Sequence, residues 1–252
     1  MRLTALLLFS LAMSLASAEE TLVLTVDGVE REALVLAPAT ASAGTTPVVF
    51  LFHGHGGKGG GFANKFDLHA YWPEALIVAP QGLPTPGRYD PQGKRSGWFA
   101  RRSDKVNRDL TFFDALLARI RSEHDVGNIF ASGHSNGGNF TYFVAASRPG
   151  VFTAIAPSGA ASRAVQRLEP MPVLHVAGKK DELVSIKAQQ QLINALKKHN
   201  NCTMADEPWD KRCDYCSSGD GTPVVACIHE GGHKFTPELV PHIVKFFRTF
   251  DE

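Results

Sequence analysis

The stretch of sequence that decides the fold is Gly133-His134-Ser135-Asn136-Gly137, which follows an apolar run at residues 129–132 and precedes a helix-like segment at 139–146. It is a G-x-S-x-G motif placed where a strand would turn into a helix. A serine in such a turn takes a strained backbone conformation, and its hydroxyl projects above the sheet. The pattern predicts that Ser135 is a nucleophile, and the alternative is a plain glycine-rich turn.

The segments on both sides of this motif alternate between short apolar runs and helical stretches. Segments 21–26 and 32–36 flank Asp27-Gly28, which is typical of a β-hairpin, and their alternating polarity predicts antiparallel edge strands. Near-continuous apolar runs predict further strands, buried on both faces, at 48–52, 75–79, 129–132, 153–156, 173–177 and 224–228. The sequence therefore predicts an α/β fold with an eight-stranded, mostly parallel sheet, helices on both faces and no large lid domain.

The helices are predicted from apolar residues that recur at a helical spacing. This periodicity marks segments 110–120 and 186–196, and a last helix is expected after Thr236-Pro237, read as a cap followed by a first-turn proline. Stretches rich in Gly, Pro and polar residues, at 81–96 and 200–223, are expected to be loops. No linker or internal repeat interrupts this pattern, so we expect a single domain.

The composition is that of a globular chain with a sizeable core. Of the 252 residues, 44% are hydrophobic and 20% are charged, which excludes fibrous and disordered classes. Lys and Arg total 26 against 25 Asp and Glu, the formal net charge is +1, and no run of like charge stands out. The chain therefore lacks the basic footprint of a nucleic-acid-binding protein.

The N-terminus carries the pattern of an export signal. Met1-Arg2 gives a charged start, residues 3–15 form an apolar core, and Ala16-Ser17-Ala18 is a small-x-small cleavage site. The apolar core is too short to span a bilayer, although a membrane anchor is the alternative. We predict that residues 1–18 are a signal peptide and that 19–252 form a single catalytic domain, secreted to the periplasm or the extracellular space without a membrane attachment.

Cys202, Cys213, Cys216 and Cys227 are the four cysteines, and they share one late segment. An even number of cysteines in an exported chain predicts two disulfides, and the sequence leaves all three pairings open. A zinc site is the alternative reading, but four-thiolate sites usually contain two Cys-x-x-Cys pairs, whereas Cys213-x-x-Cys216 is the single pair here.

A serine nucleophile needs an imidazole base, which in turn needs a carboxylate to fix its tautomer. Along the eight predicted strands, Ser135 follows the fifth, Asp181 the seventh and His233 the eighth. This chain order of serine, acid and histidine is that of the α/β-hydrolases, so we predict these three residues as the catalytic triad. Glu182 is an alternative acid, and His175, in mid-strand, is expected to be a hydrogen-bonded core residue.

A second glycine-rich stretch, His53-Gly54-His55-Gly56-Gly57, directly follows the strand predicted at 48–52. In α/β-hydrolases the loop at this place donates one amide to the oxyanion, and the residue after the nucleophile donates the other. We therefore predict an oxyanion hole formed by the backbone N–H groups of His55 and Asn136. A metal site built from the two histidines is the alternative, but no carboxylate or third imidazole neighbours them in sequence, and no metal or other cofactor is expected.

The chain resembles the secreted esterases grouped as polyhydroxybutyrate depolymerase-like and feruloyl or acetylxylan esterases, within the α/β-hydrolases. The resemblance covers nearly the whole predicted mature chain, and it implies that Ser135, Asp181 and His233 are the triad and that the late cysteines form disulfides. Lys234-Phe235-Thr236-Pro237 departs from the Trp-Pro with which the family usually continues. The matching stretches are Leu51-Phe52-His53-Gly54-x-Gly56-Gly57, residues 108–120, Gly133-His134-Ser135-Asn136-Gly137-Gly138, residues 152–159 and Gly231-Gly232-His233.

Together, the motifs and the resemblance imply a secreted serine ester hydrolase that acts through an acyl-enzyme. The expected substrates are feruloyl or acetyl esters of plant polysaccharide, or hydroxyalkanoate esters. Trp98 is a candidate aromatic wall for such a substrate, with core packing as the alternative. A serine peptidase of the same fold and a non-catalytic binding protein remain as alternatives, because one fold can carry several functions. Activity on peptides would favour the peptidase, and failure to react with an active-serine phosphonate would favour the binding protein.

Overall fold

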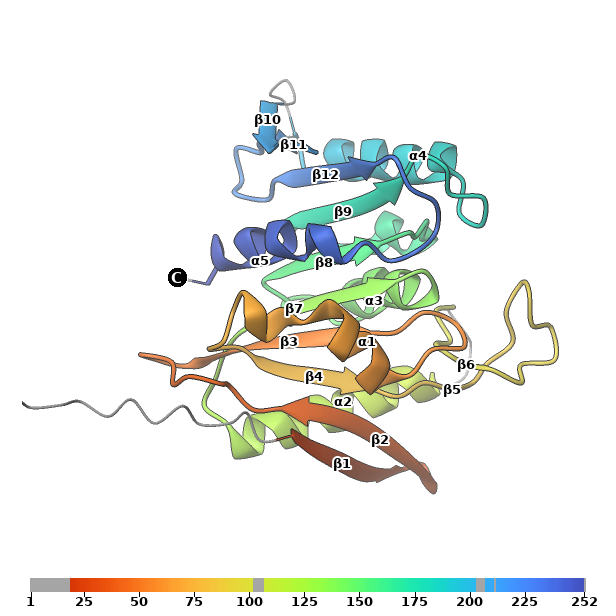
Figure 1. The fold of residues 1–252 in the computed structure, drawn as a ribbon, viewed down its shortest axis with the longest axis vertical. Helices are drawn as coiled ribbons and strands as arrows, with labels where there is room; N and C mark the ends of the chain where they lie inside the picture. Colours follow the sequence, from red (N-terminus) through yellow and green to blue (C-terminus); the bar gives the residue numbers. More distant parts are fainter. Residues whose placement is uncertain (1–18, 102–106, 203–206, 211, 252) are drawn as a thin grey trace, which may run out of the picture.

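The computed structural model describes residues 19–101, 107–202, 207–210 and 212–251. A ten-stranded sheet, in the order β1-β2-β4-β3-β7-β8-β9-β12-β11-β10, forms the centre of the molecule, and helices lie on both of its faces (Figure 1). A short ribbon, β5-β6, stands apart from this sheet. The predicted signal peptide, residues 1–18, lies outside the described residues.

The bounds of the elements are as follows. The strands are β1 (Glu19–Val26), β2 (Val29–Leu36), β3 (Thr46–Phe52), β4 (Leu76–Pro80), β5 (Leu83–Pro84), β6 (Ser96–Gly97), β7 (Val126–His134), β8 (Ala154–Ser158), β9 (Val173–Gly178), β10 (Glu207–Asp210), β11 (Cys213–Cys216) and β12 (Val224–His229). The helices are α1 (Gly59–Phe66), α2 (Arg108–Glu123), α3 (Asn136–Ser147), α4 (Ile186–His199) and α5 (Val240–Arg248), with 3₁₀ turns η1 (Leu68–Ala70), η2 (Arg163–Arg167) and η3 (Pro237–Leu239).

The sheet is parallel from β4 to β12 and antiparallel at both edges. All eight predicted strands are present in it. The additional strands β10 and β11 lie in the segment 200–223, which we expected to be a loop. They extend the sheet because β11 pairs with β12 in a register that sets Cys213 opposite Cys227. The α/β fold class is therefore confirmed, and among the described residues the main sheet has two more strands than predicted, besides the separate ribbon β5-β6.

The predicted hairpin between β1 and β2 is present. Its strands pair antiparallel from Glu19–Leu36 at one end to Val26–Val29 at the turn. Asp27 has φ 49° and Gly28 has φ 76°, so both turn residues lie in the left-handed region. A two-residue turn of this kind matches the twist of the flanking strands, which is why Asp-Gly is a strong hairpin signal.

The strands of the central sheet are buried on both faces, as their near-continuous apolar sequence predicts. In β3, Val48, Phe50 and Phe52 contribute to one core, and Val49 and Leu51 contribute to the other. Helices α2, α3 and α4 pack in the first core, and α1 and α5 pack in the second. Figure 1 shows the latter two in front of the sheet and the other three behind it.

Helix starts differ in how they are capped. The side chain of Asn107 accepts hydrogen bonds from the backbone N–H of Asp109 and of Leu110 at the start of α2, as a good N-cap residue does. Thr236 stands at the N-cap position of η3, the 3₁₀ turn that runs into α5, and Pro237 lies in its first turn as predicted, but the side chain of Thr236 makes no capping hydrogen bond. Its hydroxyl instead lies 3.2 Å from Nε2 of His229.

Within the described part of the cysteine segment, one disulfide is present, between Cys213 and Cys227, where two had been predicted. Strand register explains the difference: Cys216 stands opposite Val224 in the β11–β12 pair, so it faces no cysteine across the sheet. Cys202 lies nearby, and its thiol donates a hydrogen bond to the backbone oxygen of Cys216 over 3.4 Å. The disulfide thus ties the outer edge of the sheet to β12, the strand that leads to His233.

Removing this disulfide is expected to destabilise the fold. A double Cys213→Ser/Cys227→Ser variant releases a crosslink between residues 14 positions apart, and a loop of this length is worth about 3 kcal/mol in the unfolded chain. Urea unfolding of the variant and the native protein measures the difference. Equal free energies of unfolding, or four titratable thiols in the native protein, would contradict the assignment.

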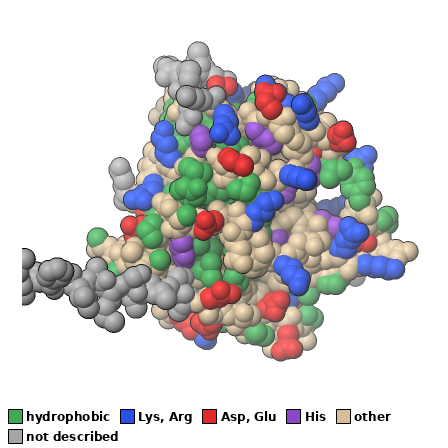
Figure 2. All heavy atoms as spheres, in the orientation of Figure 1, with side chains coloured by type: hydrophobic (Ala, Val, Ile, Leu, Met, Phe, Trp, Pro, Cys, Tyr) green, Lys and Arg blue, Asp and Glu red, His purple; other side chains and the backbone are tan. Residues whose placement is uncertain are grey.

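The outer surface carries charge of both signs. In Figure 2 the basic and acidic side chains are interspersed over the visible face, in keeping with the near-zero net charge. Within the part of the chain that the structure describes, no helix combines the length and the apolar character needed to cross a bilayer.

Candidate active site

Ser135 stands at the turn between β7 and α3, with φ 58° and ψ −116°. A non-glycine residue with positive φ is strained, and such strain is held where the surrounding structure fixes it. Here the glycines of the motif allow the close packing that does so. A Cβ atom on Gly137 would lie 2.0 Å from the backbone oxygen of Phe52, and one on Gly133 would lie 2.5 Å from the oxygen of Gly137.

The three predicted triad side chains meet at the carboxyl ends of β7, β9 and β12. Nε2 of His233 lies 2.7 Å from Oγ of Ser135, and its Nδ1 lies 2.8 Å from Oδ2 of Asp181. Asp181 keeps 1% of its side-chain surface exposed and His233 keeps 17%. The carboxylate is therefore shielded from water while the imidazole and the hydroxyl remain reachable, which is the arrangement of a serine nucleophile with its base and acid.

Asp181 is held by four donors, two on each carboxylate oxygen. Oδ1 accepts the backbone N–H of Leu183 at 2.9 Å and of Val184 at 2.8 Å. Oδ2 accepts the side-chain amide of Gln189 at 3.1 Å, besides His233. Because an ionised carboxylate only accepts hydrogen bonds, Nδ1 of His233 is the protonated nitrogen and Nε2 is free to accept the proton of Ser135. Glu182, the alternative acid, is exposed.

The glycine-rich loop after β3 passes directly against the serine. A Cβ atom on Gly54 would lie 3.7 Å from Cβ of Ser135. Within the described residues, the backbone N–H groups of His55 and Asn136 donate to no acceptor. Unpaired amides beside a nucleophile are what an oxyanion hole requires. The ring of His55 contacts an acidic side chain, with Nε2 at 3.2 Å from Oδ2 of Asp90.

The side chain of His53 holds this loop in place through hydrogen bonds. Its side chain is buried, and Nε2 accepts the backbone N–H of Gly82 at 3.0 Å while Nδ1 lies 2.7 Å from the oxygen of Gly54. These contacts require a neutral ring with its proton on Nδ1. Burial lowers the pKa of His53, which favours that neutral form.

Asn136 has a second task besides its backbone amide. Its side-chain oxygen accepts the backbone N–H of Trp98 at 2.6 Å, and its side-chain nitrogen donates to the backbone oxygen of Trp98 at 3.0 Å. These two hydrogen bonds form a clasp that joins Asn136, the residue after Ser135, to the loop that follows β6. This clasp fixes the position of the loop relative to α3.

The expectation that Trp98 forms a substrate wall is corrected by its burial. Its side chain is 2% exposed and belongs to the core, stacked on Phe140 with a centroid distance of 4.9 Å. The indole N–H donates to the backbone oxygen of His53 at 2.9 Å. Core packing, the alternative left open by the sequence, describes this residue.

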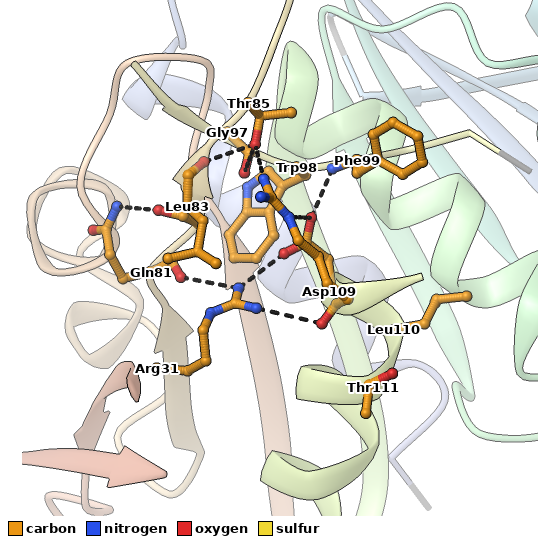
Figure 3. A network of polar contacts seen from close by, with 12 residues as sticks. Arg31, Gln81, Leu83, Thr85, Gly97, Trp98, Phe99, Asp109, Leu110 and Thr111 are labelled. Carbon is orange, nitrogen blue, oxygen red and sulfur yellow. Dashed lines mark hydrogen bonds and ion pairs between the residues drawn. The ribbon is translucent and has the colours of Figure 1, made fainter. Parts of the chain in front are cut away.

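A buried ion pair supports the same loop (Figure 3). Arg31, on β2, donates to Oδ1 of Asp109, on α2, over 2.8 Å, and both side chains are buried. The other carboxylate oxygen, Oδ2, accepts the backbone N–H of Phe99 at 2.8 Å. Since a buried pair is costly to break on one side, it fixes the segment next to Trp98. Through the hydrogen bonds between Trp98 and Asn136, it also fixes that segment against the turn at Ser135.

Several known proteins that resemble this chain are esterases by name. No protein-family model matches the chain. It is 25% identical over 201 residues to the probable feruloyl esterase C of Aspergillus clavatus, covering 75% of this chain and 70% of that protein. It is 28% identical over 175 residues to the probable feruloyl esterase C of Aspergillus niger, covering 65% of this chain but 58% of that protein.

Solved structures agree over a larger share of the chain. A cold-adapted esterase from an Arctic intertidal metagenomic library superposes with a TM-score of 0.65 at 16% identity, over 94% of this chain and 96% of that one. The chain has the α/β-hydrolase fold. A ferulic acid esterase also superposes with a TM-score of 0.65, at 15% identity, covering 93% of this chain and 99% of the ferulic acid esterase.

A further histidine lies against the candidate base. The ring of His134 is 4.9 Å from the ring of His233, between centroids, and its Nδ1 lies 3.0 Å from Oγ of Ser158. Burial, and after it the neighbouring His233, lowers the pKa of His134 to about 4. His134 therefore stays neutral near pH 7.

Two buried histidines predict how the stability of the protein depends on pH. Burial lowers the pKa values of His134 and His175 from 6.5 to about 4. Between these values the unfolded chain binds protons that the folded protein does not, so the free energy of unfolding falls as the pH decreases through this window. Each ring contributes at most about 3 kcal/mol. Urea unfolding above and below the window tests this, and unchanged stability would contradict it.

Two residues whose side chains touch the candidate triad, His134 and Gln189, were not predicted from sequence. His134 lies inside the motif, where its position next to the serine could have indicated contact with the base. Gln189 lies eight residues after Asp181, in α4, and no local pattern singles it out. Its contact with Asp181 becomes visible only when the folded structure sets α4 beside that carboxylate.

Proposed function

We propose that this α/β-hydrolase is a secreted serine esterase, which cleaves carboxylic esters with Ser135, His233 and Asp181 through an acyl-enzyme. The observation that carries the proposal is the continuous line of contacts from Ser135 through His233 to Asp181, at 2.7 and 2.8 Å. A serine hydroxyl is a weak nucleophile until a base accepts its proton, and this line supplies that base in the correct tautomer.

In the proposed mechanism, Oγ of Ser135 attacks the ester carbonyl while Nε2 of His233 takes the hydroxyl proton. Asp181 stabilises the resulting imidazolium through Nδ1, and the amides of His55 and Asn136 hold the oxyanion. The imidazolium then returns its proton to the leaving alcohol, and an acyl-enzyme remains. Water attacks the acyl group with the same base, releases the acid and restores the serine.

The substrate class is proposed from the relatives. Feruloyl esterases are among the proteins most like the chain in sequence, and a ferulic acid esterase shares its fold. We therefore propose feruloyl or acetyl esters of plant polysaccharide as substrates, and hydroxyalkanoate esters as the second possibility within the same chemistry. Secretion is supported by the export pattern of residues 1–18 and agrees with the Cys213–Cys227 disulfide.

A panel of substrates tests this proposal. Methyl ferulate, acetylated xylan, hydroxybutyrate oligomers, short nitrophenyl esters and a peptide are supplied to the mature protein. Hydrolysis of esters over the peptide supports the esterase, and the preferred ester identifies the class. Cleavage of the peptide alone would assign a peptidase instead. Failure to turn over any substrate, together with no labelling by an active-serine phosphonate, would leave a binding protein.

A further inference from the structure

Three buried polar side chains form a chain of hydrogen bonds behind Asp181. Tyr142 lies on α3, His175 in β9 and Gln189 in α4, and each is 0% exposed. Burying a polar group is costly unless it is hydrogen bonded. The three groups form a row that ends on a carboxylate in contact with the candidate base. Burying them costs more free energy than filling the same space with apolar side chains.

The contacts run without a gap from α3 to the acid. Oη of Tyr142 lies 2.8 Å from Nδ1 of His175, whose Nε2 lies 3.2 Å from Oε1 of Gln189. The amide nitrogen of Gln189 donates to Oδ2 of Asp181 at 3.1 Å and to the backbone oxygen of Val184 at 2.7 Å. Each of these contacts can pair one donor with one acceptor, and all of the hydrogen bonds can run in the same direction along the chain.

The direction of these hydrogen bonds follows from the acceptors around Asp181. Oδ2 of Asp181 and the oxygen of Val184 are both acceptors, so the NH₂ group of Gln189 must face them and its oxygen must face His175. That oxygen needs a donor, which places the ring proton of His175 on Nε2. Its Nδ1 is then bare and accepts the hydroxyl of Tyr142.

Burial supports this assignment. It lowers the pKa of His175 to about 4, so the ring carries a single proton. It also raises the pKa of Tyr142 well above its usual value, so the hydroxyl keeps the proton that it donates. All the donors in the chain therefore point toward the carboxylate.

We propose that Gln189 is a positioning residue for Asp181, and that His175 and Tyr142 hold its amide in the orientation that donates to the carboxylate. The proposal rests on the proposed function, since it assigns a role within the same site. Oδ1 is fixed by two backbone amides, and Gln189 fixes the second oxygen, so the carboxylate presents one lone pair of Oδ2 to His233. When the imidazole of His233 gains a proton, the carboxylate of Asp181 is already oriented to stabilise the positive charge.

Gln189→Met tests the proposal with a matched control on the same helix. Methionine fills a similar volume without a donor, and Gln190→Met makes the same change at the exposed neighbouring position. We expect Gln189→Met to lower kcat about 10-fold, the size of a lost hydrogen bond to a charged group, with KM within about twofold. The rate at which a phosphonate labels Ser135 should fall by the same factor, while Gln190→Met leaves both rates unchanged.

Gln189→Glu separates positioning from a purely structural role. When protonated, the introduced carboxyl group has the shape of glutamine and can donate to Asp181; when ionised, it faces a second carboxylate. Asp181 and His175 are the titratable groups that contact this side chain. The rate of Gln189→Glu relative to the wild type should therefore fall as the pH rises, at temperatures where both proteins remain folded.

The outcomes are distinguishable. If Ser135→Ala abolishes ester hydrolysis while Gln189→Met matches Gln190→Met in kcat and in labelling rate, the positioning role is overturned and the esterase stands. A relative rate of Gln189→Glu that does not change with pH also counts against it. If the wild type neither hydrolyses esters nor reacts with the phosphonate, both the proposed function and this inference fail.

Discussion

Ser135→Ala is expected to lower kcat for ester hydrolysis by about 10⁴-fold or more, with a small change in KM. The substitution removes the single oxygen that lies within 2.7 Å of Nε2 of His233 and leaves the amides of the oxyanion hole in place. What remains is the rate that binding and the oxyanion hole supply over water. Steady-state kinetics on a nitrophenyl ester measure the loss.

The control for this variant is Ser122→Ala, which removes an exposed hydroxyl from α2. It should hydrolyse the ester at the wild-type rate. Both variants should melt near the wild-type temperature, because neither hydroxyl supports the core. Retention of most activity in a folded Ser135→Ala protein would exclude Ser135 as the nucleophile.

Asp181→Asn is expected to cause the second large loss, again about 10⁴-fold in kcat. The backbone N–H groups of Leu183 and Val184 need an acceptor, so the amide oxygen of the new side chain takes the place of Oδ1. Its NH₂ group then stands where Oδ2 was and donates to Nδ1 of His233. This selects the tautomer with a proton on Nε2, which cannot accept the proton of Ser135.

The matched control is Glu182→Gln, the same chemical change at the exposed neighbour. It should leave kcat within about twofold of the wild type, as surface substitutions generally do. Rates measured side by side on one ester decide between the two acids. A large loss in Glu182→Gln and a small one in Asp181→Asn would transfer the role of acid to Glu182.

Local sequence signals predicted the parts of the fold that local physics determines. Asp27-Gly28 defined a turn because both residues adopt positive φ there. The motif around Ser135 and the order of the strands were enough to predict which three side chains meet, because the carboxyl ends of parallel strands share one edge of the sheet. Distances in sequence of up to 98 residues did not matter once that topology was recognised.

The parts that sequence missed depend on tertiary contacts. Trp98 is buried because Asn136 clasps its backbone and Phe140 stacks on its ring, and neither partner is near it in sequence. Strands β10 and β11 form where a cysteine of a polar segment pairs across the sheet edge. Gln189 matters through a contact with Asp181 that exists only after α4 docks on the sheet.

The most direct test of the central claim is to trap the acyl-enzyme. Wild type and Ser135→Ala are mixed briefly with nitrophenyl acetate, denatured in acid and digested, and the peptides are weighed by mass spectrometry. The account predicts an acetyl group on Ser135 in the wild type and none in the variant. Hydrolysis that proceeds with the acetyl group on another residue, or at an equal rate in Ser135→Ala, would contradict it.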